Sequence, residues 1–165
     1  MERSQYLLDA NVFIEASRRY YAYDIAPKFW TSLIDLVSSD RICSIERVRS
    51  ELERGNDELS DWAKENSSAM FESTDRKDVV DCFSKIMIWV QSQTQFTDAA
   101  KSEFARVADG WLVAFAKVEG YVIVTHEVLK PEARARVLIP NVCQKFGVKF
   151  VNTFDMLRDL QVKFV

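Results

Sequence analysis

Hydrophobic residues in this chain form short continuous runs separated by longer stretches with helical spacing. The runs at 6–8, 41–44, 121–125 and 148–152 are typical of buried β-strands, and YVIVT at 121–125 is the clearest because it is rich in β-branched residues. Short apolar strands that alternate with helical segments indicate βαβ units and a parallel sheet covered on both faces. The pattern therefore predicts an α/β fold: a three-layer α/β/α sandwich with a central, mostly parallel β-sheet.

Helices are predicted where apolar residues recur every three or four positions. Pro27 suits the first turn of a helix, whereas the Arg54-Gly55-Asn56 break and Gly120 suit helix ends. The predicted helical segments are 11–21, 27–38, 45–53, 58–64, 75–91 and one or two helices within 97–118.

Composition limits the classes of protein to which the chain can belong. At 165 residues, 48% hydrophobic and 28% charged, it fits one ordinary globular domain that spans 1–165. A net charge of -3 excludes a large positive field that would draw the whole protein to nucleic acid or to an anionic membrane. A polyanionic partner must therefore be bound by a local basic patch or through metal ions.

The cysteines and the N-terminal segment favour a cytoplasmic location. Cys43, Cys82 and Cys143 are odd in number and far apart, so we expect reduced thiols and no disulfide. The segment MERSQYLLDANVF lacks a long apolar stretch, which argues against a signal peptide or anchor. All apolar runs fall far short of the roughly 20 residues that cross a bilayer, so we expect no membrane association.

Four acidic residues stand out because of their positions in the predicted fold. Asp9 and Glu127 follow predicted strands, Glu51 lies beside the apolar stripe of a predicted helix, and Asp109 precedes another helix. Each has a simple structural alternative: Asp9 and Asp109 could cap helices, and Glu51 and Glu127 could be exposed to solvent.

Together, the four acids indicate a site for divalent cations. Ligands bind beyond the carboxyl ends of strands in parallel sheets, and these acids can meet at that edge. Two carboxylates about 4 Å apart repel each other by roughly 4 kcal/mol at an effective dielectric constant near 20, so such a cluster needs protons or cations. Oxygen ligands suit Mg²⁺ or Mn²⁺, whereas His126 is the single histidine, which makes a zinc or haem site a poor fit.

Three stretches of the chain, LLDANVFIE, SELERG and ADGWLVAFAKVEGYVIVTHE, resemble the PIN-domain nucleases, the family that includes ribonuclease toxins of bacterial toxin–antitoxin pairs. In that family an aspartate ends the first strand within D-x-N-hydrophobic, a glutamate lies on a later helix, and a third acid opens a helix ahead of a strand. Asp9, Glu51 and Asp109 match these acids. Thr125, His126 and Glu127 match the family's Thr-x-Asp element, with a last acid that is one methylene longer.

The resemblance spans nearly the whole chain. VKFVN and TFDMLRDL fit the family's closing strand and helix, whereas the helical middle at 57–104 is larger than in a minimal PIN domain. The N-terminal segment LLDANVFIEASRRYYAYDIAPKFW is similar to a PIN-like subgroup whose members often sit beside antitoxin-like genes.

The resemblance implies a ribonuclease that hydrolyses RNA phosphodiester bonds with Mg²⁺ or Mn²⁺. Asp9, Glu51 and Asp109 would hold the metal, and Glu127 would be an outer ligand. Asn11 and Thr125 would hydrogen-bond the carboxylates or the attacking water, with turn formation and strand-end capping as the alternative. It also implies a cognate antitoxin that fills the acidic groove, commonly with an arginine, and a possible homodimer.

Two basic segments could bind the RNA. Guanidinium groups lie beside tyrosines in the run that follows the first acid, a combination that single-stranded RNA recognition uses, and more cations follow the last acid. Exposed charges and half-buried tyrosines are the alternative, and His126 could contact phosphate, act as an acid or be an ordinary surface residue. The candidate residues are Arg18, Arg19, Tyr20, Tyr21 and Tyr23 in the first segment and Lys130, Arg134 and Arg136 in the second.

Other enzyme classes fit less well. A haloacid-dehalogenase-type phosphotransferase needs D-x-D where this chain has Asp9-Ala10-Asn11, and a dinucleotide-binding Rossmann domain needs a glycine-rich turn after the first strand. The remaining rival is a catalytically inactive PIN-like scaffold that binds protein or RNA without cutting it.

Overall fold

The computed structural model describes residues 3–165. In this part of the chain a five-stranded sheet has the order β3-β2-β1-β4-β5, and neighbouring strands are parallel throughout it. The strands are β1 (Tyr6–Leu8), β2 (Ile42–Ile45), β3 (Phe71–Glu72), β4 (Val122–Val124) and β5 (Phe150–Val151). This confirms the predicted α/β class and places β1 at the centre of the sheet.

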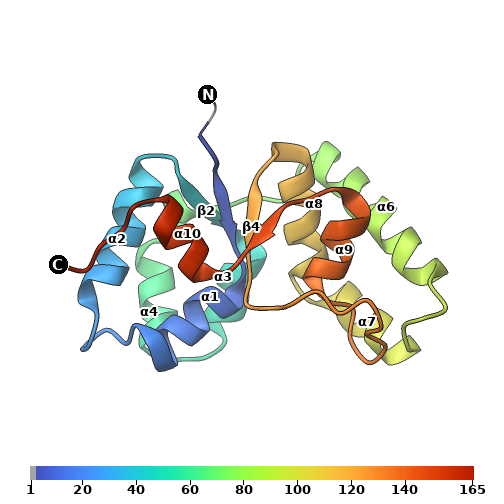
Figure 1. Ribbon diagram of the computed structural model, residues 1–165, viewed down its shortest axis with the longest axis horizontal. Coiled ribbons are helices and arrows are strands. Elements are labelled where there is room, and N and C mark those ends of the chain that lie inside the picture. The colour runs from blue at the N-terminus through green and yellow to red at the C-terminus, as the bar shows by residue number, and fades with distance from the viewer. Residues whose placement is uncertain (1–2) are drawn as a thin grey trace.

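Helices cover both faces of the sheet, so the molecule has three layers. In Figure 1, α2, α4 and α10 lie on one side of the strands, and α6, α7, α8 and α9 lie on the other. The helices are α1 (Ala10–Glu15), α2 (Pro27–Ser38), α3 (Glu46–Glu53), α4 (Glu58–Glu65), α5 (Ser67–Met70), α6 (Lys77–Ser92), α7 (Asp98–Arg106), α8 (Asp109–Glu119), α9 (Ile139–Phe146) and α10 (Thr153–Asp159). A π-helix, η1 (Ala16–Tyr20), continues α1.

The hydrophobic core is centred on β1 and on helix α8. Leu7 and Leu8 are fully buried, as expected of a central parallel strand with helices on both faces. Helix α8 is also largely apolar, and Leu112 and Val113 are fully buried. Asp9, which follows β1, and Asp109, the first residue of α8, are therefore held by buried elements.

Three observed elements do not appear among the predicted ones: β3, α5 and α9. Strand β3 has two residues and α5 has four, which is too short for a hydrophobic period to be recognised. Helix α9 has Pro140 in its first turn, where proline is compatible with a helix because the first N–H groups have no intrahelical partner. The 97–118 region contains two helices, α7 and α8.

Candidate functional site

Asp9 lies at the carboxyl end of the central strand and is only 3% exposed. Its backbone N–H donates to the carbonyl of Val124 at 3.0 Å, which ties the end of β1 to the end of β4. The hydroxyl of Thr125, also buried, donates to Asp9 Oδ2 at 3.0 Å. The parallel pairing of β1 with β4 thus brings together two residues that are 116 positions apart.

Glu51 and Asp109 meet at the start of helix α8. The Glu51 Oε1 atom accepts a hydrogen bond of 3.0 Å from the backbone N–H of Ala108, the residue before the helix. A carboxylate is favourable there because the first N–H groups of a helix have no intrahelical acceptors and the helix dipole is positive at that end. This contact positions Glu51 next to Asp109, the first residue of α8.

Glu127 follows Thr125 and is held by the chain beyond it. Its Oε2 atom accepts a 2.8 Å hydrogen bond from the N–H of Ile139 at the start of α9, and Oε1 lies 3.2 Å from the guanidinium of Arg136. Its own N–H donates to Thr125 Oγ1 at 3.1 Å. Thr125 therefore links Asp9 to the backbone of Glu127, and the Glu127 carboxylate is largely engaged.

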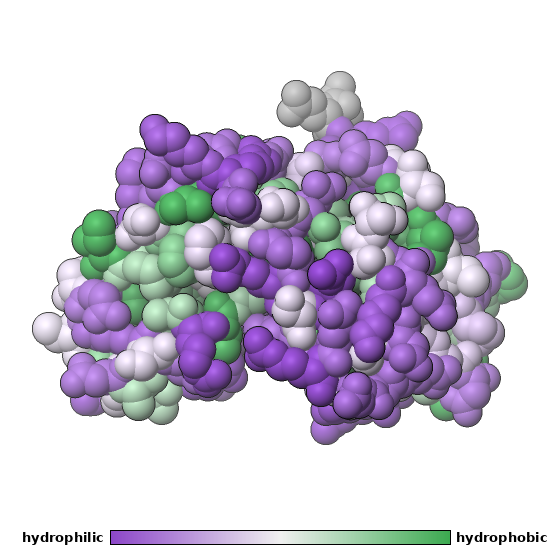
Figure 2. Space-filling view, turned by 180° about the vertical axis from the view of Figure 1, so that it is seen from behind, coloured by the Kyte–Doolittle hydropathy of each residue, from purple (hydrophilic) through white to green (hydrophobic). Residues whose placement is uncertain are grey.

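The four predicted acids line a single cavity of about 400 Å³ at the carboxyl ends of the strands. Asn11, which was predicted to assist them, also lines it. Three arginines that line the cavity as well, here called the rim arginines, are Arg54, Arg106 and Arg136. The molecular surface is indented at the lower edge in Figure 2, where mostly hydrophilic residues are seen.

Burial and mutual repulsion raise the pKa values of these acids. Burial raises the pKa of Asp9 to about 7, with a further contribution from the charge of Glu127, while the Thr125 hydroxyl acts in the opposite direction. The pKa of Asp109 lies well above its usual value because of burial and the charges of Asp9, Glu127 and Glu51. Burial also raises the pKa of Glu127. The acids are therefore close enough to one another to interact electrostatically.

The donor set is compatible with a hard divalent cation. It contains the four carboxylates and the amide of Asn11, whereas His126 hydrogen-bonds through Nε2 to the hydroxyl of Thr153 at 3.0 Å. Within residues 3–165, however, no three His, Cys, Asp or Glu side chains are grouped closely enough to hold one metal ion. Coordination of one ion by three of these acids therefore requires side-chain movement.

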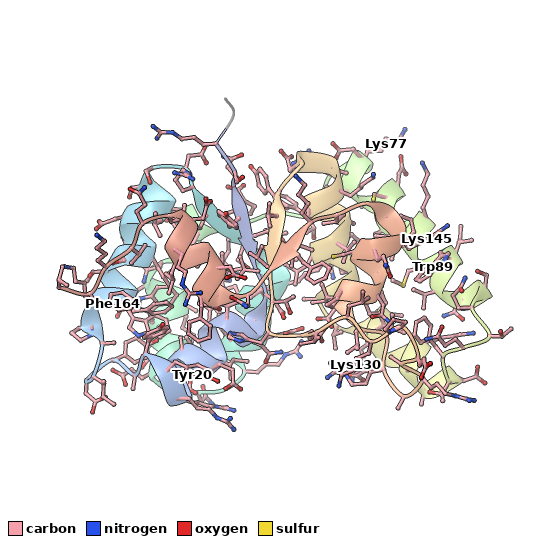
Figure 3. The ribbon with its side chains drawn as sticks, viewed as in Figure 1. Tyr20, Lys77, Trp89, Lys130, Lys145 and Phe164 are labelled. Carbon is pink, nitrogen blue, oxygen red and sulfur yellow. The ribbon has the colours of Figure 1, made fainter. Side chains whose placement is uncertain are left out.

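The predicted RNA-binding residues lie in two separate places. Arg18 and Arg19 are exposed on η1, and Lys130 and Arg134 are exposed in the loop between β4 and α9. Figure 3 shows Tyr20 and Lys130 on opposite sides of the lower edge. The ring of Tyr21 stacks on Phe29, with centroids 4.5 Å apart, so this ring is part of the core packing and Tyr20 is the more accessible of the two.

Two of the rim arginines, Arg54 and Arg106, were not among the predicted binding residues. Arg54 follows Glu51 by three positions, so its helical proximity to that acid was a usable signal. Arg106 lies at the end of α7 and forms an ion pair with Glu103. Its position at the cavity depends on how α7 packs, which a local pattern does not reveal.

Two general expectations can be compared with the described residues. Cys43, Cys82 and Cys143 are all free thiols. Among the helices in residues 3–165, none combines the length and the apolar character needed to cross a membrane.

Comparisons with known proteins support the fold. The chain is similar to a chain in the crystal structure of VapBC2 from Rickettsia felis bound to a DNA fragment from their promoter, with a TM-score of 0.55 and 12% sequence identity over 89% of this chain and 97% of that chain. This similarity and the parallel sheet confirm the predicted PIN-like fold. No curated protein matches the chain. Residues 6–164 match the model of a protein family described as Domain of unknown function (DUF4411), and the chain therefore belongs to that family.

Proposed function

We propose that this protein is a divalent-metal-dependent ribonuclease and the toxin of a bacterial toxin–antitoxin pair. The observation that carries the proposal is that Asp9, Glu51, Asp109 and Glu127 line one cavity at the carboxyl ends of the central strands. Carboxylates in this number and this degree of burial are unfavourable unless protons or cations neutralise them. Similarity in fold to a chain of VapBC2 is consistent with this proposal.

Asp9, Glu51 and Asp109 would hold Mg²⁺ or Mn²⁺, and Glu127 would be the outer ligand. When bound, the cation would lower the pKa of a water molecule and neutralise charge on the phosphate in the transition state. Thr125 orients Asp9 through its hydroxyl, at 3.0 Å from Oδ2. Asn11 contributes an amide on the same cavity wall that can orient the attacking water.

The flanking cations have a separate task. The rim arginines can pair with phosphates on either side of the scissile bond, because guanidinium groups bind phosphate in a bidentate manner. Arg18, Arg19, Lys130 and Arg134 lie further out and would contact more distant phosphates. Without such local cations, a chain of net charge -3 would repel RNA.

The partners implied by this function are an RNA substrate and a cognate antitoxin in the cytoplasm, with a possible homodimer. The acidic cavity offers an antitoxin arginine the same carboxylates that bind the metal. Arg136, which already lies 3.2 Å from Glu127, is an internal example of such a pairing.

A second candidate function is that of a PIN-like scaffold that binds RNA or protein without cutting it. The observation that favours it is that two of the acids already have partners. Glu127 accepts a hydrogen bond from the N–H of Ile139 and pairs with Arg136, and Glu51 accepts a hydrogen bond from the N–H of Ala108. If these contacts persist in solution, fewer carboxylate oxygens remain to hold a cation, and hydrolysis would be weak or absent.

The test is to incubate the full chain with a panel of structured RNAs and Mg²⁺ or Mn²⁺, with Asp9→Asn and Asp35→Asn as variants. Asp35→Asn is a matched control because Asp35 is exposed on α2, away from the cavity. We expect cleavage by the wild type and by Asp35→Asn, and loss of cleavage in Asp9→Asn or with a chelator. Cleavage that persists in Asp9→Asn would contradict the assignment of the site. RNA binding with no cleavage under any metal would favour the scaffold.

A further inference from the structure

Beside the acidic cavity, three rings from different parts of the chain form a partly exposed cluster. Tyr20, His126 and Phe154 are brought together, and this cluster is called the aromatic platform below. The Tyr20 ring lies nearly parallel to the His126 ring, with an interplanar angle of 13°, and edge-on to the Phe154 ring, with centroids 5.6 Å apart. The sheet order explains the cluster, because Tyr20 follows β1, His126 follows β4 and Phe154 follows β5, and these strands are neighbours.

The rings of the platform are accessible. Tyr20 is 50% exposed and Phe154 is 36% exposed, although large aromatic side chains are usually more buried. The Tyr20 and His126 centroids are 6.2 Å apart, whereas the face-to-face pair of Phe83 and Trp111 in this protein is separated by 3.8 Å. The faces of Tyr20 and His126 are therefore not fully covered by each other.

The platform adjoins the acidic cavity through Glu127. A hollow of about 410 Å³ is lined by Tyr20, His126, Arg19 and Glu127 among others. Glu127 also lines the acidic cavity, so the two hollows share this side chain. A third hollow of about 460 Å³ contains His126, Glu127 and Phe154. A ligand bound at the acids can therefore extend onto the platform.

The chemistry of the platform suits a nucleobase. His126 contributes an aromatic ring that lies nearly parallel to the Tyr20 ring and can stack on a base. The hydrogen bond to Thr153 fixes the orientation of this ring. Arg18 and Arg19 are exposed on the same π-helix as Tyr20 and supply positive charge for a phosphate. π-helical turns occur frequently at functional sites.

We propose that the aromatic platform is a base-stacking subsite for an unpaired nucleotide next to the phosphodiester at the acidic cavity. The inference rests on the proposed function in so far as it requires that the chain bind a single-stranded RNA. It adds Tyr20, His126 and Phe154 as residues that select for an unpaired, unstacked base, because every nucleobase has a face that stacks on an aromatic ring, whereas a base inside a duplex has both faces covered by its stacked neighbours.

The experiment measures binding of a labelled short single-stranded RNA by fluorescence anisotropy. The full chain carries Asp9→Asn so that the RNA stays intact, which a gel of each sample verifies. Replacing Tyr20 with alanine in this background should weaken binding about 5- to 150-fold, the range for loss of one base–aromatic stack. Tyr20→Phe should retain the affinity, because the ring remains. Ile88→Ala, which removes a 71% exposed apolar side chain on α6, is the matched control and should have no effect.

A second RNA series distinguishes stacking from a structural effect. Each RNA in the series lacks one base, and for the RNA whose missing base normally occupies the platform, Tyr20→Ala should cause no further loss. If Tyr20→Ala fails to fold, as judged by circular dichroism, Phe154→Ala is measured with the same series of RNAs.

The outcomes separate this inference from the proposed nuclease activity. The subsite would be overturned, and the nuclease left intact, if the wild type cuts the RNA while Tyr20→Ala and Phe154→Ala bind it as tightly as the Asp9→Asn parent does. RNA binding that depends on Tyr20, with no cleavage by the wild type, would support the subsite and contradict the nuclease. The subsite would also be overturned if the parent binds no RNA, or if Tyr20→Ala weakens binding to a protein partner but not to RNA.

Discussion

The carboxylate of Asp9 is buried with the hydroxyl of Thr125 as a close hydrogen-bonding partner. Hydrogen bonds from Thr125 and from the backbone of Ala10 do not replace the hydration that a charged carboxylate loses on burial, and the nearby charge of Glu127 adds repulsion. In the absence of a cation, the protein therefore retains a proton on this group to near-neutral pH. A cation bound beside this group would offset the cost of ionising it.

The raised pKa of Asp9 predicts that the protein loses stability as the pH rises. The pKa is about 7 in the folded state and 3.8 in the reference state, so between these values the folded protein holds a proton that the unfolded chain has released. The free energy of unfolding should fall as the pH rises from about 4 to 7, and further as Asp109 ionises, because its pKa is also raised. Urea unfolding in chelator across this range measures the slope.

The matched variant for this prediction is Asp9→Asn, which keeps the shape and cannot ionise. It should be more stable than the wild type at pH 8, on the order of a few kcal/mol, and its dependence on pH should be shallower. Equal stability of the two proteins at pH 8 and equal slopes would show that Asp9 ionises normally.

At the scale of elements, the connection between α8 and β4 links Asp109 to the hydrogen-bonding partner of Asp9. Asp109 begins α8, Gly120 caps its end, and β4 then leads to Thr125, which hydrogen-bonds to Asp9. Gly120 has a φ of +75°, and a Cβ atom there would meet no heavy atom within 4 Å. The glycine is thus required by the backbone conformation alone and not by space.

Replacing Gly120 with alanine should reduce the free energy of unfolding by about 1 kcal/mol, because a left-handed conformation is strained for a residue with a Cβ atom. Gly120→Asn should lose less, since asparagine tolerates this conformation better. Urea unfolding of the three proteins tests the ranking. A loss with asparagine as large as that with alanine would indicate a cause other than the φ angle.

At the scale of the whole molecule, two groups of helices lie on opposite sides of the sheet (Figure 1), and the acidic cavity is lined by residues from several of these elements. Asp9 comes from the central strand, Glu51 from α3, Asp109 from α8 and Glu127 from the chain after β4. A cation bound by these residues would link both helical layers to the sheet. Binding should therefore stabilise the entire fold and not only one loop.

The expected result is a rise in the melting temperature of the wild type when Mg²⁺ or Mn²⁺ is added to chelator-treated protein. A ligand at 100 times its Kd stabilises the folded state by about 2.7 kcal/mol. Asp9→Asn should show a smaller rise, and Asp35→Asn should behave as the wild type. Differential scanning fluorimetry measures the shift without any RNA, and identical shifts in Asp9→Asn and the wild type would rule out a cation site at Asp9.

The residue pattern of the chain determined the fold class, because alternation of short apolar strands with helices permits few architectures other than a covered parallel sheet. It also indicated Asp9, Glu51, Asp109 and Glu127, since acids at strand and helix ends are recognisable from local sequence. The helix boundaries at Pro27 and Gly120 followed from the same local chemistry.

Only the tertiary structure decided which distant residues meet. Tyr20, His126 and Phe154 form one cluster because β1, β4 and β5 are adjacent, and that order results from long-range packing that no local period encodes. The orientation of Glu127 likewise depends on the N–H of Ile139 at the start of α9, a helix that the hydrophobic pattern did not predict. Local chemistry thus specifies the elements and their candidate acids, whereas strand order and helix packing specify the geometry in which they can act.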